Sequence, residues 1–289
     1  MYFPPDSDVM FIMPNVPYIA NWFYEHPGLD LSLKGIWIAD PSLSYGLVQQ
    51  EIPALRFAQA NKNLFPFNST FWAELQQISD SCGYTDYLDK LVPDSFTGPA
   101  GHWSDYSLNP VFDVYRVSDT WPNLWSVLGF SRSTQEFICF NRTDVQDAIH
   151  APHITWNSCS NDAVYVNETT GVPGRDTSMP STLSVLPNVI EKSVRTVIVH
   201  GLADFILIAE GTRIAIQNMS WEGAQGFQAL IEDETFTVQN MGVYGNMHTE
   251  RKLTYVEFFF SGHMTPQFVP WAAFNTMAYL LGRQPSPAT

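Results

Sequence analysis

The sequence is poor in basic residues. Its 289 residues include 14 Lys and Arg against 29 Asp and Glu, which gives a formal net charge of −15. A protein that binds nucleic acids needs a basic surface that displaces counterions from phosphates. No basic stripe of this kind is present, so the composition argues against a nucleic-acid partner.

Long apolar runs are also missing. No stretch of about 18 uninterrupted apolar residues occurs, so the sequence predicts no membrane span. The first residues, MYFPPDSDVMFIMPNVPY, lack the basic start and the apolar core of a signal peptide. No spacing of His, Cys and carboxylate residues indicates a metal cluster, and no metal is therefore expected.

Cysteine is scarce. The chain has three, Cys82, Cys139 and Cys159, so one is unpaired if a single disulfide forms. Both a secreted protein that has lost a pairing partner and a cytosolic protein with three buried thiols fit this count. Four Asn-x-Ser/Thr sequons give modest support to a secretory route. They predict glycosylation at Asn68, Asn141, Asn167 and Asn218.

Helix and strand signals alternate near the start of the chain. VPYIANWFYEH places apolar residues near the i, i+3, i+4, i+7 spacing of a helix face. LSLKGIWIADP then reads as a strand with the apolar centre Ile-Trp-Ile. This order indicates the second half of a βαβ unit, which predicts an α/β fold whose first strand would lie upstream of Met1.

The middle of the chain is irregular and rich in Pro, Trp, Ser and Asn. Helices are expected at ALRFAQANKNL, STFWAELQQISDSCG and TDVQDAIHA. In the last of these, Thr143 and Gln146 predict a capping box. A separate helical domain is the alternative to an insertion here. The predicted division is a core over 1–44 and 187–283, a helical or irregular insertion over 45–186, and a disordered tail over 284–289.

Two apolar runs near the C-terminus each break into a turn that carries a titratable group. VRTVIV is typical of a buried strand, and the HGLAD turn after it delivers Asp204. LTYVEFFF is apolar nearly throughout, as expected for a strand covered on both faces, and the SGHM turn after it delivers His263. The triad of an α/β hydrolase comes in the chain order Ser, Asp, His. The two residues are therefore candidates for the Asp and the His.

Each candidate also has a structural interpretation. A single Asp after a strand is most often a turn residue or a helix cap, and a single His before a helix is more often structural. His102, His153 and His200 have no matching context, and we expect them to be structural or exposed.

The segments HGLADFILIAEGTRIAIQNMSWEGAQGF and VEFFFSGHMTPQFVPWAAFNTMAYLLG resemble the last third of a serine carboxypeptidase, most closely the fungal branch. In that family a Gly-x-x-Asp turn carries the triad Asp, and a Gly-His-Met turn carries the triad His. The match maps onto Gly201, Asp204, Gly262, His263 and Met264. Weaker resemblances in the same order extend it over essentially all of this chain: VPYIANWFYEH, GIWIADPS, CGYTDYLDKLVP, FNRTDVQDAIHAP and VLPNVIEKSVRTVIVHG.

The resemblance implies an incomplete α/β hydrolase fold with the helical insertion over the active site. It implies release of C-terminal amino acids from peptides by acyl transfer, with a peptide C-terminus as partner and no cofactor. Asp204 and His263 would be catalytic, and Met264 would lie near the pocket of the departing residue. A secreted or vacuolar/lysosomal location is implied as well.

The departures from the family pattern concern the nucleophile. The family's Gly-Glu-Ser-Tyr-x-Gly turn is absent from the sequence, as is the Gly-Gly-Pro-Gly stretch that supplies oxyanion-hole amides. In the family both precede the helix that VPYIANWFYEH resembles, so they would lie before Met1. We therefore expect a truncated carboxypeptidase that is inactive as written. The alternative is a non-catalytic α/β hydrolase homologue that acts as a binding or vestigial protein.

Overall fold

The protein is represented by a computed structural model, which describes a defined part of the chain. The described residues are 15–28, 32–62, 65, 67–91, 141–155, 165–166, 173–174, 176, 178–205, 207–229 and 234–289. The chain divides into two units, which we describe separately. The smaller unit comprises 1–11 and 118–178, and the larger comprises 12–117 and 179–289.

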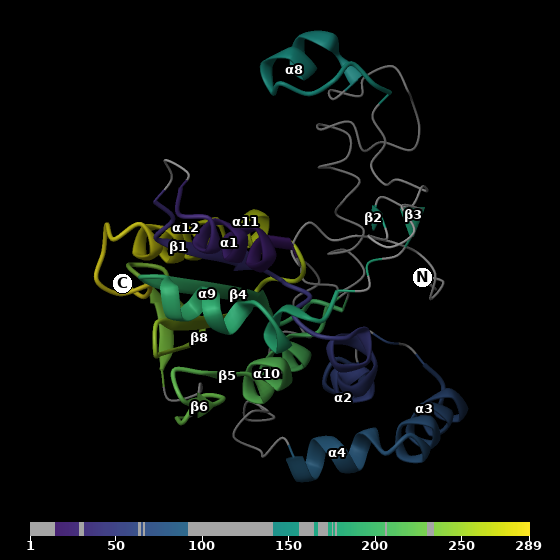
Figure 1. Ribbon diagram of the computed structural model, residues 1–289. Helices are drawn as coiled ribbons and strands as arrows, with labels where there is room; N and C mark the ends of the chain where they lie inside the picture. The colour runs from purple at the N-terminus through teal and green to yellow at the C-terminus, as the bar shows by residue number, and fades with distance from the viewer. Residues whose placement is uncertain are drawn as a thin grey trace. The chain divides into compact units, whose positions relative to one another are not determined.

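The larger unit contains a five-stranded mixed sheet with the order β1-β4-β9-β8-β7. Figure 1 labels its strands β1, β4 and β8. Strands β1, β4 and β9 are parallel, β8 is antiparallel to β9, and β7 is antiparallel to β8. The strands are β1 (Gly35–Ala39), β4 (Arg195–Gly201), β7 (Thr235–Val238), β8 (Gly242–Glu250) and β9 (Leu253–Phe258).

Helices and short elements complete both units. The α-helices of the larger unit are α1 (Asn15–Glu25), α2 (Ile52–Ala60), α3 (Ser69–Ser81), α4 (Tyr84–Leu91), α9 (Leu186–Lys192), α10 (Ala209–Asn218), α11 (Thr265–Phe268) and α12 (Pro270–Leu280). It also has a π-helical segment η1 (Leu47–Glu51), a 3-10 segment η5 (Ser181–Leu183), and a small hairpin of β5 (Ser220–Trp221) and β6 (Ala224–Gln225). The smaller unit has α8 (Thr143–Ala148) and the antiparallel pair β2 (Tyr165–Val166) and β3 (Pro173–Gly174).

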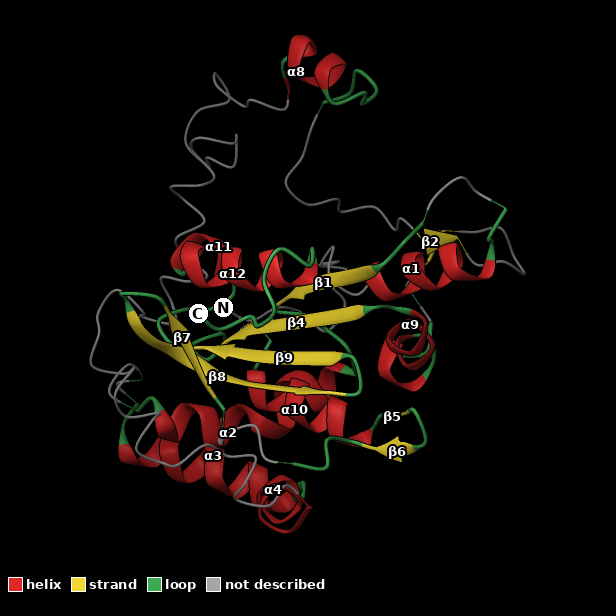
Figure 2. Cartoon of the chain, turned by 90° about the vertical axis from the view of Figure 1, so that its left-hand side faces the viewer, coloured by secondary structure: helices red, strands yellow, loops and turns green. Residues whose placement is uncertain are grey.

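The two faces of the sheet are buried against different helices, because successive side chains of a strand point to opposite faces. Ile198 of β4 and Tyr255 of β9 pack in one cluster with residues of α1, α9 and α10. Val199 and Val256, their neighbours in sequence, pack in a second cluster with residues of α12. Figure 2 shows α10 and α12 on opposite sides of the sheet. Burial of both faces explains why β4 has the apolar centre Val-Ile-Val and why β9 is mostly apolar.

The predicted elements of the core are present, with differences where polar residues interrupt the pattern. The helix, the first strand and the two late strands correspond to α1, β1, β4 and β9. Val269 separates α11 from α12, because the residue before Pro270 disfavours helical backbone. Strands β7 and β8 were not predicted, since GVYGNMHTE of β8 contains two glycines and shows no regular alternation of apolar residues.

The predicted capping box at the start of α8 is wrong. The residue at the N-cap position is Arg142, and no side chain there bonds to the helix amides. The side-chain amide of Gln146 instead donates to the carbonyl of Ile154 at 2.7 Å. Its amide group is therefore directed at the loop that follows the helix and not at the helix start.

The predicted division of the chain differs in outline from the observed units. Of the predicted insertion 45–186, residues 118–178 belong to the smaller unit, and the rest belongs to the larger unit with the sheet. Residues 284–289, which we expected to be disordered, lie beside β7. There the Thr289 amide donates to the carbonyl of Thr237, and the Thr237 hydroxyl donates to the main-chain oxygen of Thr289, both at 3.0 Å. Within the described residues, no helix has both the length and the apolar character to cross a bilayer.

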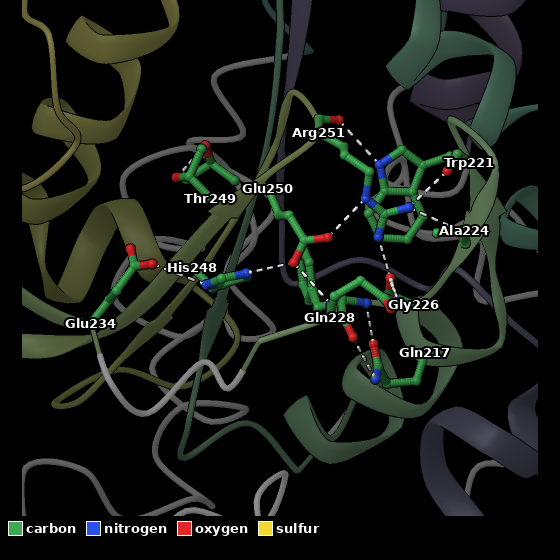
Figure 3. Close-up of polar contacts among 12 residues, drawn as sticks. Gln217, Trp221, Ala224, Gly226, Gln228, Glu234, His248, Thr249, Glu250 and Arg251 are labelled. Atoms are coloured by element: carbon green, nitrogen blue, oxygen red, sulfur yellow. Dashed lines mark hydrogen bonds and ion pairs between the residues drawn. The ribbon is translucent and has the colours of Figure 1, made fainter.

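The turn between β8 and β9 is held by a group of polar contacts around Arg251 (Figure 3). The Arg251 guanidinium donates to the carbonyls of Trp221 at 2.7 Å and Ala224 at 2.9 Å, and it lies 3.8 Å from the centroid of the Trp221 ring. Its Nε donates to Glu250 at 2.8 Å. We call the group the Arg251 cluster, and its members are Trp221, Glu234, His248, Glu250 and Arg251.

Candidate active site

The turn that carries Asp204 contacts the turn after β9. Strands β4 and β9 are parallel, so their carboxyl ends lie at the same edge of the sheet. Beyond that edge the amide of Leu202 donates to the carbonyl of Phe258, and the amide of Ala203 donates to the carbonyl of Ser261, each at 2.9 Å. Two backbone hydrogen bonds therefore hold together the turns that carry the predicted Asp and His.

Gly201 allows the two turns to approach this closely. A Cβ atom on Gly201 would lie 2.3 Å from the carbonyl oxygen of Gly262 and 2.6 Å from that of Ser261. Any side chain at this position would force the two turns apart. The HGLAD turn thus requires glycine at this position, because its backbone lies very close to the backbone of Ser261 and Gly262.

The structure brings Asp204 and His263 together. Nδ1 of His263 lies 2.8 Å from Oδ2 of Asp204, which is within hydrogen-bond range. Asp204 is fully buried, and His263 is 8% exposed. Because Nδ1 faces a carboxylate, it carries the proton, and Nε2 of the neutral ring is then the proton acceptor.

The two groups stabilise each other's charged forms. Burial by itself lowers the pKa of His263, but the charge of Asp204 and the hydrogen bond to it outweigh burial and raise that pKa to about 9. Burial by itself raises the pKa of Asp204, but the charge of His263 and hydrogen bonds from His200 and His263 lower it to about 2. The site therefore favours a carboxylate beside an imidazolium.

Two further buried groups, Asp40 and His200, adjoin this pair. One carboxylate oxygen each from Asp40 and Asp204 and one ring nitrogen of His200 all lie within 4.8 Å of one another. All three residues are fully buried. Nε2 of His200 lies 2.6 Å from the carbonyl oxygen of Leu207 and 3.4 Å from Oδ2 of Asp204. We call Asp40, His200, Asp204 and His263 the Asp204 cluster.

The ring nitrogens of His200 and the carboxylate oxygens of Asp40 already make hydrogen bonds within the protein. Nδ1 of His200 lies 3.1 Å from the hydroxyl of Thr212, so both ring nitrogens have protein partners. Asp40 accepts from backbone amides of Gly201 and Thr265. Carboxylates and imidazoles can bind metal ions, but here they form a hydrogen-bonded network within the protein.

We expected His200 to be structural or exposed, and Asp40 was not among the predicted site residues. His200 is buried beside Asp204, within the site. Asp40 lies 161 positions before its hydrogen-bond partner Gly201. Its one sequence signal is its place after the apolar run GIWIA, where a polar side chain reaches the same sheet edge as Asp204.

The remaining predicted site residues are Met264 and the sequon asparagines. Met264 follows His263, precedes α11 and is half-buried. Three sequon asparagines, Asn68, Asn141 and Asn218, are exposed, and Asn167 lies outside the described residues. The Asn68 side chain accepts the Phe71 amide at 2.9 Å and caps α3.

Comparison with known proteins places this chain among carboxypeptidases. A family profile described as serine carboxypeptidase matches residues 122–283. A probable serine carboxypeptidase of Arthroderma benhamiae is 40% identical, with 93% of this chain and 55% of the relative covered. Serine-type carboxypeptidase F of Aspergillus niger is 36% identical, with coverage of 93% and 59%. The chain belongs to the serine carboxypeptidase family.

A solved structure supports the fold. Kex1(delta)p, a prohormone-processing carboxypeptidase from Saccharomyces cerevisiae, matches with a TM-score of 0.57 at 19% identity, over 93% of this chain and 60% of that one. The likeness confirms the predicted α/β hydrolase class. The chain spans less than two thirds of the length of each of these relatives.

Proposed function

We propose that this chain supplies the aspartate and the histidine of the catalytic triad of a serine-type carboxypeptidase, which releases amino acids from the C-termini of peptides. The observation that supports the proposal is the buried 2.8 Å contact between Asp204 and His263 on neighbouring turns. The chain order of the two residues matches that of an α/β hydrolase triad. Membership of the serine carboxypeptidase family favours the same chemistry.

In this proposal each side chain has a defined step. Nε2 of His263 accepts the proton of a serine hydroxyl as that oxygen attacks the carbonyl of the last peptide bond. The imidazolium then donates the proton to the departing amino group, and Asp204 fixes the tautomer and stabilises the imidazolium. Backbone amides stabilise the oxyanion. Met264, next to His263, would contact the departing residue, and the chemistry requires no cofactor.

We also propose that the 289-residue chain alone does not hydrolyse peptides. Its sequence contains no Gly-Glu-Ser-Tyr-x-Gly turn, which presents the nucleophile in this family. Ser261 does not replace it, because it is buried two residues before His263 and its hydroxyl donates to the Gly262 carbonyl at 3.0 Å. A nucleophile needs a hydroxyl held against the base, and a strained turn provides this in α/β hydrolases.

A secretory route is part of the same proposal. Asn68, Asn141 and Asn218 lie on the surface, where a glycan can be attached without loss of packing. A secreted or vacuolar location would fit this modification. Expression of the chain in a fungal host, followed by glycosidase treatment and mass spectrometry, tests it, and unmodified asparagines at all sequons would contradict it.

The activity test uses two proteins. The first is the 289-residue chain, and the second is a chimera in which this chain is joined to the segment of the Arthroderma benhamiae relative that it does not match. Both are assayed with a blocked dipeptide and with a serine-reactive phosphonate. We expect turnover and labelling of the chimera and neither for the chain alone.

Two outcomes would contradict the proposal. Labelling of a serine in the chain alone would show that a nucleophile within this sequence had been overlooked. A folded chimera without turnover would favour the second candidate, a non-catalytic binding protein. The specific observation in favour of that candidate is the absence of the nucleophile motif.

A further inference from the structure

We propose that Asp40 is a positioning residue of the active site, whose carboxylate holds the turns that carry Asp204 and His263 in their relative places. The inference rests on the proposed function, because it takes Asp204 and His263 as the catalytic pair. Asp40 acts on the imidazole through the two turns, whose backbone amides its carboxylate accepts.

The contacts of Asp40 connect three segments that are far apart in sequence. Its Oδ1 accepts the amide of Gly201, the last residue of β4, at 2.7 Å. Its Oδ2 accepts the amide of Thr265, the first residue of α11, at the longer distance of 3.4 Å. Its own amide donates to the carbonyl of Val199 at 2.8 Å. One residue at the end of β1 thus contacts both chain segments that flank the catalytic pair.

The backbone of Asp40 is constrained as well. Its φ angle is 45°, in the left-handed region that residues other than glycine seldom occupy. Asp is among the few side chains that tolerate this region. A conformation of this kind persists where the surrounding structure enforces it, and such residues concentrate at active sites. The side chain is also fully buried, so its two hydrogen bonds compensate for lost hydration.

The carboxylate of Asp40 also contributes charge to the site. The titratable groups that act on it are His200 of β4, Asp204 after β4 and His263 after β9. Burial raises the pKa of Asp40 to about 7, and His200 offsets only part of that effect. Above this pH the negative charge of Asp40 is one of the causes that raise the pKa of His263. Geometry and charge therefore act on the same imidazole.

The test is nuclear magnetic resonance of the full 289-residue chain with 15N-labelled histidine and 13C-labelled aspartate, which requires no turnover. The His263 signals are assigned by comparison with His263→Ala. Asp40→Asn keeps an acceptor for the Gly201 amide and removes the charge, and Asp40→Leu removes both. The matched control is Ile38→Val, a substitution of a fully buried residue on the same strand that leaves the carboxylate in place.

We expect Asp40→Asn to lower the pKa of His263 by about one unit, as loss of a nearby negative charge does. Asp40→Leu should in addition broaden or abolish the Nδ1–H signal of His263, because the two turns lose their common acceptor. Ile38→Val should leave both signals unchanged. In the unmodified chain, the 13C signal of the Asp40 carboxyl and the 15N shift of His263 should show an inflection at a common pH near 7.

An unchanged pKa of His263 in Asp40→Asn would overturn the proposal, as would an equal shift in Ile38→Val. If neither Asp40 variant folds, the unmodified chain decides: absence of a common inflection would overturn the proposal. An inactive chimera with these shifts present would contradict the proposed function and leave the role of Asp40 in place. An active chimera without these shifts would support the proposed function and contradict the role of Asp40.

Discussion

Two clusters of histidine and carboxylate lie at opposite ends of β9, and their chemistry differs. The Asp204 cluster lies beyond Phe258, where β4 and β9 end together. The Arg251 cluster lies around the turn that precedes Leu253, and Figure 3 shows His248 between two carboxylates there. His263 of the Asp204 cluster and His248 of the Arg251 cluster each make hydrogen bonds of about 3 Å to carboxylates.

Burial and number of partners separate the clusters. Asp204 is fully buried, whereas Glu250 has 20% and Glu234 has 40% of its side chain exposed. Both nitrogens of His248 contact carboxylates, which leaves no imidazole nitrogen for a substrate. His263 contacts its acid through Nδ1. The two histidine–carboxylate contacts therefore differ in the exposure of the acid and in the number of acids that contact the ring.

The largest expected effect concerns the two histidines. In the chimera, His263→Ala should reduce kcat by about a millionfold, or about 8 kcal/mol, because the general base is lost. His248→Ala, the matched control, should change kcat by no more than a few-fold. Steady-state kinetics with a blocked dipeptide measures both. Equal losses in the two variants would remove the distinction between the clusters.

A smaller loss is expected when the acid is changed. Asp204→Asn should lower kcat of the chimera by about ten-thousandfold, since the imidazole then adopts the wrong tautomer. Glu250→Gln serves as its control, because Glu250 also contacts a histidine at 3.1 Å. Similar kcat values for Asp204→Asn and Glu250→Gln would contradict the assignment of Asp204.

Stability should also distinguish buried from exposed ion pairs. Arg213 of α10 and Glu257 of β9 form a buried bidentate pair, and Arg213 is 2% exposed. Glu257→Gln should reduce the free energy of unfolding by about 3–5 kcal/mol, because it leaves a buried charge without its partner. Glu250→Gln should cost about 1 kcal/mol or less and depend on salt. Urea unfolding at two salt concentrations checks this, and salt dependence of the Glu257 variant would count against it.

The smallest effects are those of pH on the stability of the folded chain. The pKa of His263 is raised from 6.5 to about 9, so its contribution is present below pH 6.5 and is lost as pH rises through 9. The pKa of Asp204 is lowered to about 2, so its contribution is present above pH 3.8 and is lost as pH falls through 2. His263→Ala should remove the alkaline decline in urea unfolding curves. A decline of equal size in that variant would refute the link.

The sequence was sufficient for those parts that depend on local pattern. The strands that carry Asp204 and His263 are apolar runs of buried residues, so their ends and the residues beyond them could be located. The contact between the two residues followed from chain order and family resemblance. Strand β8 could not be located in this way, because its contribution is hydrogen bonding to β9, which leaves no apolar periodicity in GVYGNMHTE.

Asp40 shows why the rest of the site was not predictable. An aspartate after a short strand is ordinary in sequence, and its function depends on which strand lies beside it. Only the pairing of β1 with β4 places its carboxylate against the Gly201 amide. The same holds for His200, whose burial depends on contacts with Leu207 and Thr212 beyond its strand.

The pairing of β1 with β4 also has a kinetic consequence. Gly35 pairs with Arg195 across the longest loop in the sheet, whereas Glu250 pairs with Leu253 across a tight turn. Closing a loop that is roughly fifty times longer costs about 3.5 kcal/mol more in chain entropy. The β7–β9 meander should therefore form early during refolding, and the docking of β1 should be slow. Because Asp40 arrives with β1, the complete Asp204 cluster would be among the last parts of this protein to assemble.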